Sequence, residues 1–172
     1  DVLFAALIVP ALVVMPLWAW IGHRRGKRAG YATASVVFLA GAVLLLLSRS
    51  LPTAAILALV GLCGIGYAGM QMFPLAMLPD TVAADARGTG RQRAGTFTGV
   101  WTAGETVGFA VGPALVLLVL AATGFVSSSG QTAAQPESAL TGVLVSFTVL
   151  PAALVAASLP LIARYRLEGE PE

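Results

Sequence analysis

Five stretches of this sequence are long and apolar enough to cross a lipid bilayer, and this feature limits the fold more than any other. They cover approximately residues 2–22, 30–47, 53–78, 96–123 and 140–163. A helix needs about 20 apolar residues to span the hydrocarbon core, and none of the stretches alternates as a strand would. Only 10% of the residues are charged, against about 25% in soluble domains. The sequence therefore predicts an all-α membrane protein with five transmembrane helices.

The basic residues predict how these helices are oriented. Nine of the ten Lys and Arg residues follow the first, third and fifth spans, in segments 23–28, 80–95 and 164–166. Short loops rich in Lys and Arg stay on the cytoplasmic side. We therefore expect an integral protein of the plasma (inner) membrane, with its C-terminus in the cytoplasm and its first residue outside. An odd number of spans with an external start is expected of a part of a longer protein.

Composition also excludes several classes of function. The chain has one cysteine and one histidine, so we expect neither an internal disulfide nor a metal site. The pI is about 9.1, but the positive charges lie in short loops between spans, and we therefore expect no nucleic-acid partner. The sequence has no nucleophile–base set and no nucleotide-binding loop. We expect a protein that is not an enzyme and that holds no cofactor.

One acidic residue, Glu105, lies inside a predicted span. On a helical wheel its neighbours share one face, with Thr98, Trp101, Glu105 and Phe109 in a stripe and Thr102 and Thr106 flanking it. A carboxylate that faces lipid costs a few kcal/mol, so we interpret Glu105 as a proton- or cation-binding group that faces a cavity. The alternative is a structural glutamate bonded to a neighbouring helix. Trp101 either lines the same cavity or fills space between helices.

Two further polar side chains lie inside the third span. Gln71 stands shortly before a proline, and Tyr67 lies one helical turn before Gln71 on the same face. The amide of Gln71 both donates and accepts hydrogen bonds, as recognition of a sugar hydroxyl requires. The pair either lines a substrate site or bonds to a neighbouring helix.

The third and fourth spans also contain patterns of small residues and prolines. Glycines crowd both spans, at Gly61, Gly64, Gly66 and Gly69 in the third and at Gly104, Gly108 and Gly112 in the fourth. Small residues at such spacings let helices approach closely in lipid. Pro74, Pro79 and Pro113 favour kinks. These features fit moving helices as well as static packing.

The segment 80–95 places acids beside arginines at the membrane surface. The acids are Asp80 and Asp85, and the arginines are Arg87, Arg91 and Arg93. We interpret the segment as a cytoplasmic gate loop, in which an aspartate pairs with an arginine of the same loop or of a neighbouring helix end. The alternative is an ordinary solvated loop whose positive charge only sets the orientation.

Three stretches carry a resemblance to a known family. They are "PLAMLPDTVAADARGTGRQRAGTFTGVW", "WAWIGHRRGKR" and "ARYRLEGE". With these motifs the chain resembles the glycoside–pentoside–hexuronide:cation symporter branch of the major facilitator superfamily, the melibiose-permease-like transporters. The resemblance implies that the five spans correspond to helices 8–12 of a twelve-helix fold. Residues 1–172 would then be a partial C-terminal six-helix bundle, and the N-terminal half and the seventh helix would be missing partners.

The resemblance also implies roles for particular residues. Gln71 matches a position that often faces the sugar, and Trp101 and Thr102 match cavity-lining positions. Asp80, Asp85, Arg91 and Arg93 match the cytoplasmic gate loop. The usual lysine of the family aligns with Thr106, directly after Glu105, and His23 stands where an aspartate is usual. Because a carboxylate takes the place of a cation here, the resemblance does not carry over melibiose-type sugars as the substrate or sodium as the ion.

Together these features predict a secondary transporter that acts by alternating access. We expect symport of a small polar solute, such as a glycoside, coupled to H⁺ or Na⁺. One alternative is export or flipping of an amphiphile, such as a drug or a lysolipid. A second is a membrane assembly partner that transports nothing. The expected partners are a small-molecule substrate, the lipid bilayer and the other half of the transporter.

Overall fold

The computed structural model describes residues 2–127 and 134–165, and these residues form helices and connections without any strand. The helices are α1 (Val2–Arg25), α2 (Lys27–Leu45), α3 (Thr53–Thr89), α4 (Ala94–Ala122), α5 (Glu137–Phe147) and α6 (Val149–Ala163), with a 3₁₀ turn, η1 (Ser48–Ser50), before α3. Five helical segments are long and apolar enough to cross a membrane, and α5 and α6 together make the fifth. The prediction of an all-α chain with five transmembrane helices is confirmed.

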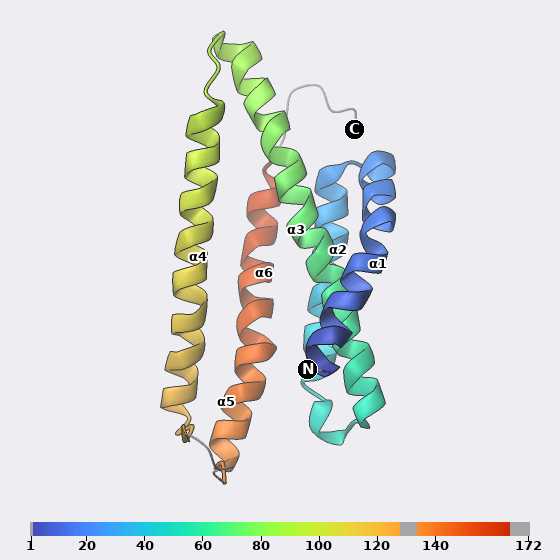
Figure 1. Ribbon diagram of the computed structural model, residues 1–172, viewed down its shortest axis with the longest axis vertical. Helices are drawn as coiled ribbons and strands as arrows, with labels where there is room; N and C mark the ends of the chain where they lie inside the picture. Colours follow the sequence, from blue (N-terminus) through green and yellow to red (C-terminus); the bar gives the residue numbers. More distant parts are fainter. Residues whose placement is uncertain (1, 128–133, 166–172) are drawn as a thin grey trace.

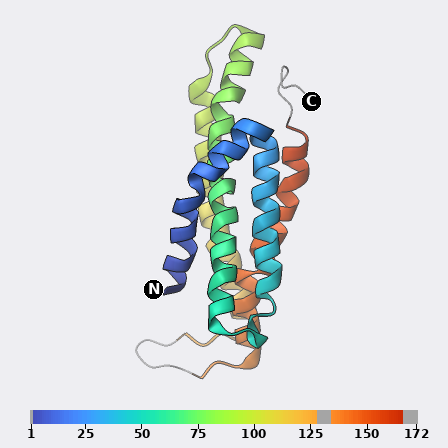
Figure 2. The ribbon, with the colours of Figure 1, turned by 90° about the vertical axis from the view of Figure 1, so that its right-hand side faces the viewer.

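The helices run up and down, so that successive connections lie at opposite ends of the bundle (Figure 1). The α1–α2 turn, the α3–α4 turn and the end of α6 share one end, which we call the basic end. The start of α1, η1 and the start of α5 lie at the other end. Figure 2 shows α2 between α3 and α6, and α2 packs on both of them. The described residues of the three basic segments thus lie at one end of the bundle, as their alternation along the sequence predicted.

The tightest packing lies between α1, α2 and α3, where glycines bring the backbones together. A Cβ atom added at Gly64 would lie 2.1 Å from the carbonyl oxygen of Leu7 in α1. One added at Gly66 would lie 2.6 Å from the backbone nitrogen of Phe38 in α2. Such approaches are open only to residues without a side chain. The prediction of close helix contacts is therefore confirmed for these two glycines of the third span.

Two aromatic side chains complete this core. Trp18 in α1 is 3% exposed, and its Nε1 donates a hydrogen bond to the carbonyl of Ile65 at 2.9 Å. Phe73 in α3 is 1% exposed and meets Trp18 edge-on, with 6.0 Å between the ring centroids. The Phe73 ring lies against Gly22 and Gly30, where an added Cβ would collide with it. Helices α1, α2 and α3 therefore form one packed unit.

Helix α4 packs much less closely. None of its residues is buried, and a Cβ added at Gly104, Gly108 or Gly112 would meet no described atom within 4 Å. The helix meets α3 at the basic end and packs along α5 (Figure 1). The glycine repeat of the fourth span, unlike that of the third, makes no close helix contact within the part of the chain that the structure describes.

The end of α3 differs most from its expected place. The helix continues to Thr89, so the segment 80–95, which was expected to be a loop, connects α3 and α4 without regular structure only over 90–93. Pro79 lies within α3 and does not end it. The alanine-rich sequence after Pro79 favours a helix. The helix ends where Gly90 takes the left-handed conformation, with φ 67.

The fifth span is interrupted near its middle, where one unbroken helix was expected. Thr148 separates α5 from α6 with φ −119 and ψ −65, and it is 2% exposed. Its hydroxyl donates to the carbonyl of Leu144 at 2.6 Å. Pro151 follows in the first turn of α6. Proline has no backbone N–H, so this position is compatible with the start of a new helix and unfavourable inside a continuous one.

Candidate functional site

The polar stripe of α4 is the candidate coupling site. Glu105 is exposed, and its carboxylate has no hydrogen bond or ion pair with any residue of 2–127 or 134–165. Thr102 and Thr106 are exposed as well, and the hydroxyl of Thr106 donates to the carbonyl of Thr102 at 2.8 Å. A carboxylate without a protein partner on an apolar helix requires water, a cation or a bound solute. With Thr98, which is also exposed, the stripe presents one acid and three hydroxyl groups.

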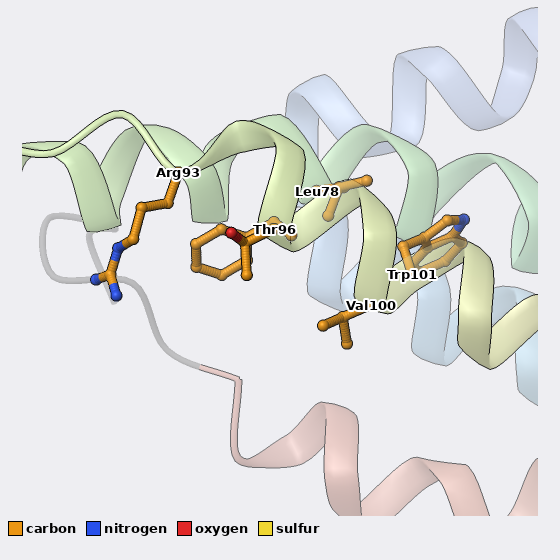
Figure 3. A pocket seen from close by; sticks show the side chains of 6 residues that line it. Leu78, Arg93, Thr96, Val100 and Trp101 are labelled. Carbon is orange, nitrogen blue, oxygen red and sulfur yellow. The ribbon is translucent and has the colours of Figure 1, made fainter.

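Trp101 belongs to the same stripe and also lines a hollow. The hollow has a volume of about 310 Å³ and opens where α3 and α4 converge (Figure 3). Its wall consists of Leu78, Arg93, Thr96, Phe97, Val100 and Trp101. Trp101 is half-buried, and its Nε1 is shielded from solvent without a hydrogen-bond acceptor among the described residues. The wall is mostly apolar, and Arg93 supplies its positive charge.

Tyr67 and Gln71 lie together on α3. Both side chains are exposed, and Nε2 of Gln71 donates to the hydroxyl of Tyr67 at 3.1 Å. This bond leaves the amide oxygen of Gln71 as an acceptor. The hydrogen bonds found among residues 2–127 and 134–165 do not join the pair to the α4 stripe. A role for Tyr67 and Gln71 in substrate binding thus stays a prediction.

At the basic end, Arg93 ties the start of α4 to α3. Its Nε and Nη2 donate to the two carboxylate oxygens of Asp85, at 3.0 and 2.5 Å. Two parallel bonds fix the guanidinium more firmly than one bond does. Arg91 is exposed, and within the described residues it forms no ion pair; its backbone N–H donates to the hydroxyl of Thr89. The structure therefore brings Asp85 and Arg93 together and leaves Arg91 apart.

Asp80 has a partner that sequence reasoning missed. Its carboxylate pairs with the ammonium of Lys27, which also donates to the carbonyl of Ala76 at 2.9 Å. An arginine of the same loop or of a neighbouring helix end was the expected partner, and the lysine at the start of α2 takes this place. The sequence did contain an indication of this pair. No acidic residue stands between residues 2 and 79, so Asp80 is the first acid after the basic turn that can pair with one of its cations. Whether either ion pair acts as a gate stays a prediction.

Comparison with known proteins assigns the chain to a family. The profile of a family described as MFS/sugar transport protein matches residues 1–169. The chain belongs to this family. A relative described as an uncharacterized symporter, from Synechocystis sp. (strain ATCC 27184 / PCC 6803 / Kazusa), is 30% identical over 157 residues. The match covers 90% of this chain and 29% of that protein. No solved structure matches the chain significantly.

Membership in the MFS/sugar transport family confirms the resemblance to the major facilitator superfamily. Together with five helices that are long and apolar enough to cross a membrane, it makes the chain an integral membrane protein of a transport family. The matched relative is more than three times as long as the aligned segment. Substrate, coupling ion and direction of transport therefore belong to the proposals that follow.

Proposed function

We propose that this chain is part of a secondary transporter that couples the movement of a small polar solute, such as a glycoside, to H⁺ or Na⁺. The observation that carries the proposal is the carboxylate of Glu105, which has no partner among residues 2–127 and 134–165 and lies on an apolar helix of a transport-family protein. No other acidic residue lies inside the predicted spans. The name of the relative, a symporter, supports the same kind of coupling.

The coupling step follows from the chemistry of Glu105. An ionised carboxylate in an apolar surrounding attracts a proton or a cation, because its charge is poorly solvated there. Binding of the ion neutralises the charge and lowers the cost of closing the cavity around it. Release on the other side of the membrane restores the carboxylate. The conformational change that carries the site across the membrane therefore costs less free energy when Glu105 has bound its ion than when the site is empty.

Substrate binding would use the hydroxyl, amide and indole groups of the two helices that converge at the basic end. Thr102 offers a hydroxyl, and Trp101 offers an apolar ring on which one face of a sugar can pack. Gln71 and Tyr67 offer the matching acceptors and donors from α3. The hydrogen bond between them, 3.1 Å long, already orients the amide.

We also propose that the basic end faces the cytoplasm and that its ion pairs act as a gate. The arginine and lysine residues that gather there favour this orientation. The Lys27–Asp80 pair joins α2 to α3, and the Arg93–Asp85 pair joins α3 to α4. Each pair is partly exposed, so each contributes roughly 0–1 kcal/mol. Pairs of this strength can open in each cycle without unfolding the protein.

The test replaces Glu105 in the complete transporter, purified and reconstituted in liposomes. A panel of radiolabelled methyl glycosides identifies a transported probe, and an enclosed pH-sensitive dye reports proton movement. We expect Glu105→Gln to abolish uphill accumulation driven by an ion gradient, while exchange of the probe continues. Glu137→Gln is the matched control, because Glu137 lies at the exposed start of α5. Accumulation by Glu105→Gln at wild-type levels across pH would contradict the proposal.

The hollow between α3 and α4 favours a second candidate, the export of an anionic amphiphile. Its wall combines Leu78, Phe97 and Val100 with the guanidinium of Arg93. An acyl chain would occupy the apolar part, and an acidic head group would have to displace Asp85 from the guanidinium of Arg93. Under this function a fluorescent lysophosphatidylglycerol would be transported by the wild type and not by Arg93→Gln. Methyl glycosides would then be neither accumulated nor able to compete.

A further inference from the structure

The break at Thr148 divides the fifth span into two helices that pack on different neighbours. Helix α5 packs along α4, whereas α6 packs on α2. From this division and from the backbone of the break, we infer that Thr148 is a hinge. About it, α4 and α5 move as one hairpin relative to α6 and the packed unit of α1, α2 and α3. The hinge would serve the proposed transport cycle, but its motion can be measured without any transported solute.

The backbone at the break lacks part of the bonding that stiffens a helix. Pro151 has no N–H, so the carbonyl of Phe147 receives no bond from the residue four positions later. The N–H and the hydroxyl of Thr148 both donate to one acceptor, the carbonyl of Leu144, at 3.0 and 2.6 Å. Helices bend where a proline or a side-chain hydroxyl interrupts their regular bonds. A change of the bend at this place therefore breaks few backbone bonds.

The break is enclosed by the described part of the chain itself. Thr148 is buried, and the Oγ of Ser146 is shielded from solvent. That hydroxyl has no hydrogen-bond acceptor among residues 2–127 and 134–165. A buried polar group without a partner raises the free energy of the conformation that holds it. It therefore favours a second conformation of the break, in which the hydroxyl reaches an acceptor.

Helices α4 and α5 are joined tightly at the end of the bundle opposite the basic end. The side-chain amide of Gln135 bonds to both backbone groups of Val126, accepting from its N–H at 3.0 Å and donating to its carbonyl at 2.8 Å. A Cβ added at Gly142 in α5 would lie 2.1 Å from Oγ1 of Thr123 at the end of α4. The hydroxyl of Thr123 is itself fixed by a bond to the carbonyl of Val119 at 2.9 Å. The two helices thus form one hairpin.

Helix α6 is held instead by the packed unit. The hydroxyls of Tyr31 in α2 and Ser158 in α6 share a hydrogen bond of 3.0 Å. Leu159 and Ile162 of α6 pack against the core cluster that contains Trp18. A motion of the hairpin relative to the packed unit must therefore be absorbed between α5 and α6, which is where the regular bonding is interrupted.

The chain passes between the hairpin and the other helices at two places, the turn 90–93 and Thr148. A rotation of the hairpin about the line that joins these places leaves both connections intact. Ion pairs cross between the two parts, from Arg49 to Glu137 and from Arg93 to Asp85. Partly exposed pairs contribute little to stability, so they do not prevent this rotation.

The test measures distances by double electron–electron resonance in the complete transporter, reconstituted in proteoliposomes on a cysteine-free background. Nitroxide labels are attached to Ser50→Cys in η1 and Ser138→Cys at the start of α5, both at exposed positions. Helix α5 has 11 residues and is about 16 Å long, so a bend of about 20° displaces its start by up to about 6 Å. We expect the wild type, measured with and without NaCl at acidic and neutral pH, to show two distances that differ by about this amount.

Pro151→Ala supplies the missing N–H, so the helix can continue through the break. We expect this variant to show a single Ser50–Ser138 distance under every condition. The matched control is Pro160→Ala, which removes a proline from the same span inside α6 and away from the break. This control should keep both distances.

A second pair of labels, at Val126→Cys and Ser138→Cys, lies within the hairpin and should show one unchanged distance. A single narrow Ser50–Ser138 distance in the wild type under all conditions would overturn the hinge, as would two undiminished distances in Pro151→Ala. A Val126–Ser138 distance that varies equally would overturn it too, because α4 and α5 would then not move together. No transported solute is present, so these results stand apart from the outcome of the Glu105→Gln test.

Discussion

Replacing Gly64 by alanine tests whether close backbone packing holds α1 against α3. The added Cβ would lie 2.1 Å from the carbonyl oxygen of Leu7, which is 1.3 Å short of the 3.4 Å at which ordinary contact begins. The obstacle is backbone, so no side-chain rotation relieves it, and the two helices must separate. Overpacking of this kind costs about 1–3 kcal/mol. We expect Gly64→Ala to lower the free energy of unfolding by that amount.

The same helix supplies a graded series of controls. At Gly66 the nearest atom to an added Cβ is 2.6 Å away, at Gly61 it is 3.4 Å away, and at Gly88 no atom lies within 4 Å. We therefore expect alanine to destabilise most at Gly64, less at Gly66 and little at Gly61. At Gly88 alanine should be neutral or add up to about 1 kcal/mol of helix stability.

Thermal melting of the complete transporter in detergent, followed by tryptophan fluorescence, measures this order. The Gly64→Ala variant should melt a few degrees below the wild type, and the Gly88→Ala variant should melt at or slightly above it. Equal melting temperatures for the Gly64 and Gly88 variants would refute the argument from backbone contact. A lower melting temperature for the Gly61→Ala variant than for the Gly64→Ala variant would also refute this argument.

Three more substitutions test other contacts of the bundle. Trp18→Phe removes a buried hydrogen bond and ring volume, so we expect a loss of about 1–3 kcal/mol, measured by the same melting. Asp80→Asn leaves Lys27 without its partner, and we expect it to change the free energy of unfolding by at most roughly 1 kcal/mol. The transport rate and the accessibility of introduced cysteines should nevertheless change. If the rate and the accessibility both stay unchanged, the pair is no gate. Arg49→Gln breaks the 3.2 Å contact with Glu137. Because this pair is exposed, we expect the free energy of unfolding to change by at most roughly 1 kcal/mol, measured by the same melting.

The number and type of spans could be predicted because each depends on a local property of the sequence. A run of about 20 apolar residues has only one common structure in lipid, since its backbone must bond within itself. The end of α3 could not be predicted in this way. Pro79 and the charged residues after it suggested a loop, whereas the alanines that follow continue the helix to Thr89. Local signals there conflicted, and helix propensity prevailed.

The ion pairs show the same division between local and tertiary information. Asp85 and Arg93 stand eight residues apart, on either side of a short turn, and their pairing was among those expected from the sequence. The pair of Lys27 and Asp80 joins residues 53 positions apart. This pair forms only because α2 and α3 pack side by side in a particular register. The number and order of charges in the sequence do not predict that register.

The division of packing within the bundle bears on how such a protein would move. Helices α1, α2 and α3 are held by backbone contacts at Gly64 and Gly66 and by the buried ring of Phe73, which leave little freedom for relative motion. Helix α4 carries Glu105 and has no buried residue. Segments with few buried contacts open at lower free energy than the packed core. Within residues 2–127 and 134–165, the candidate coupling acid therefore lies on the helix with the least buried surface, beside a unit of three helices packed through glycines.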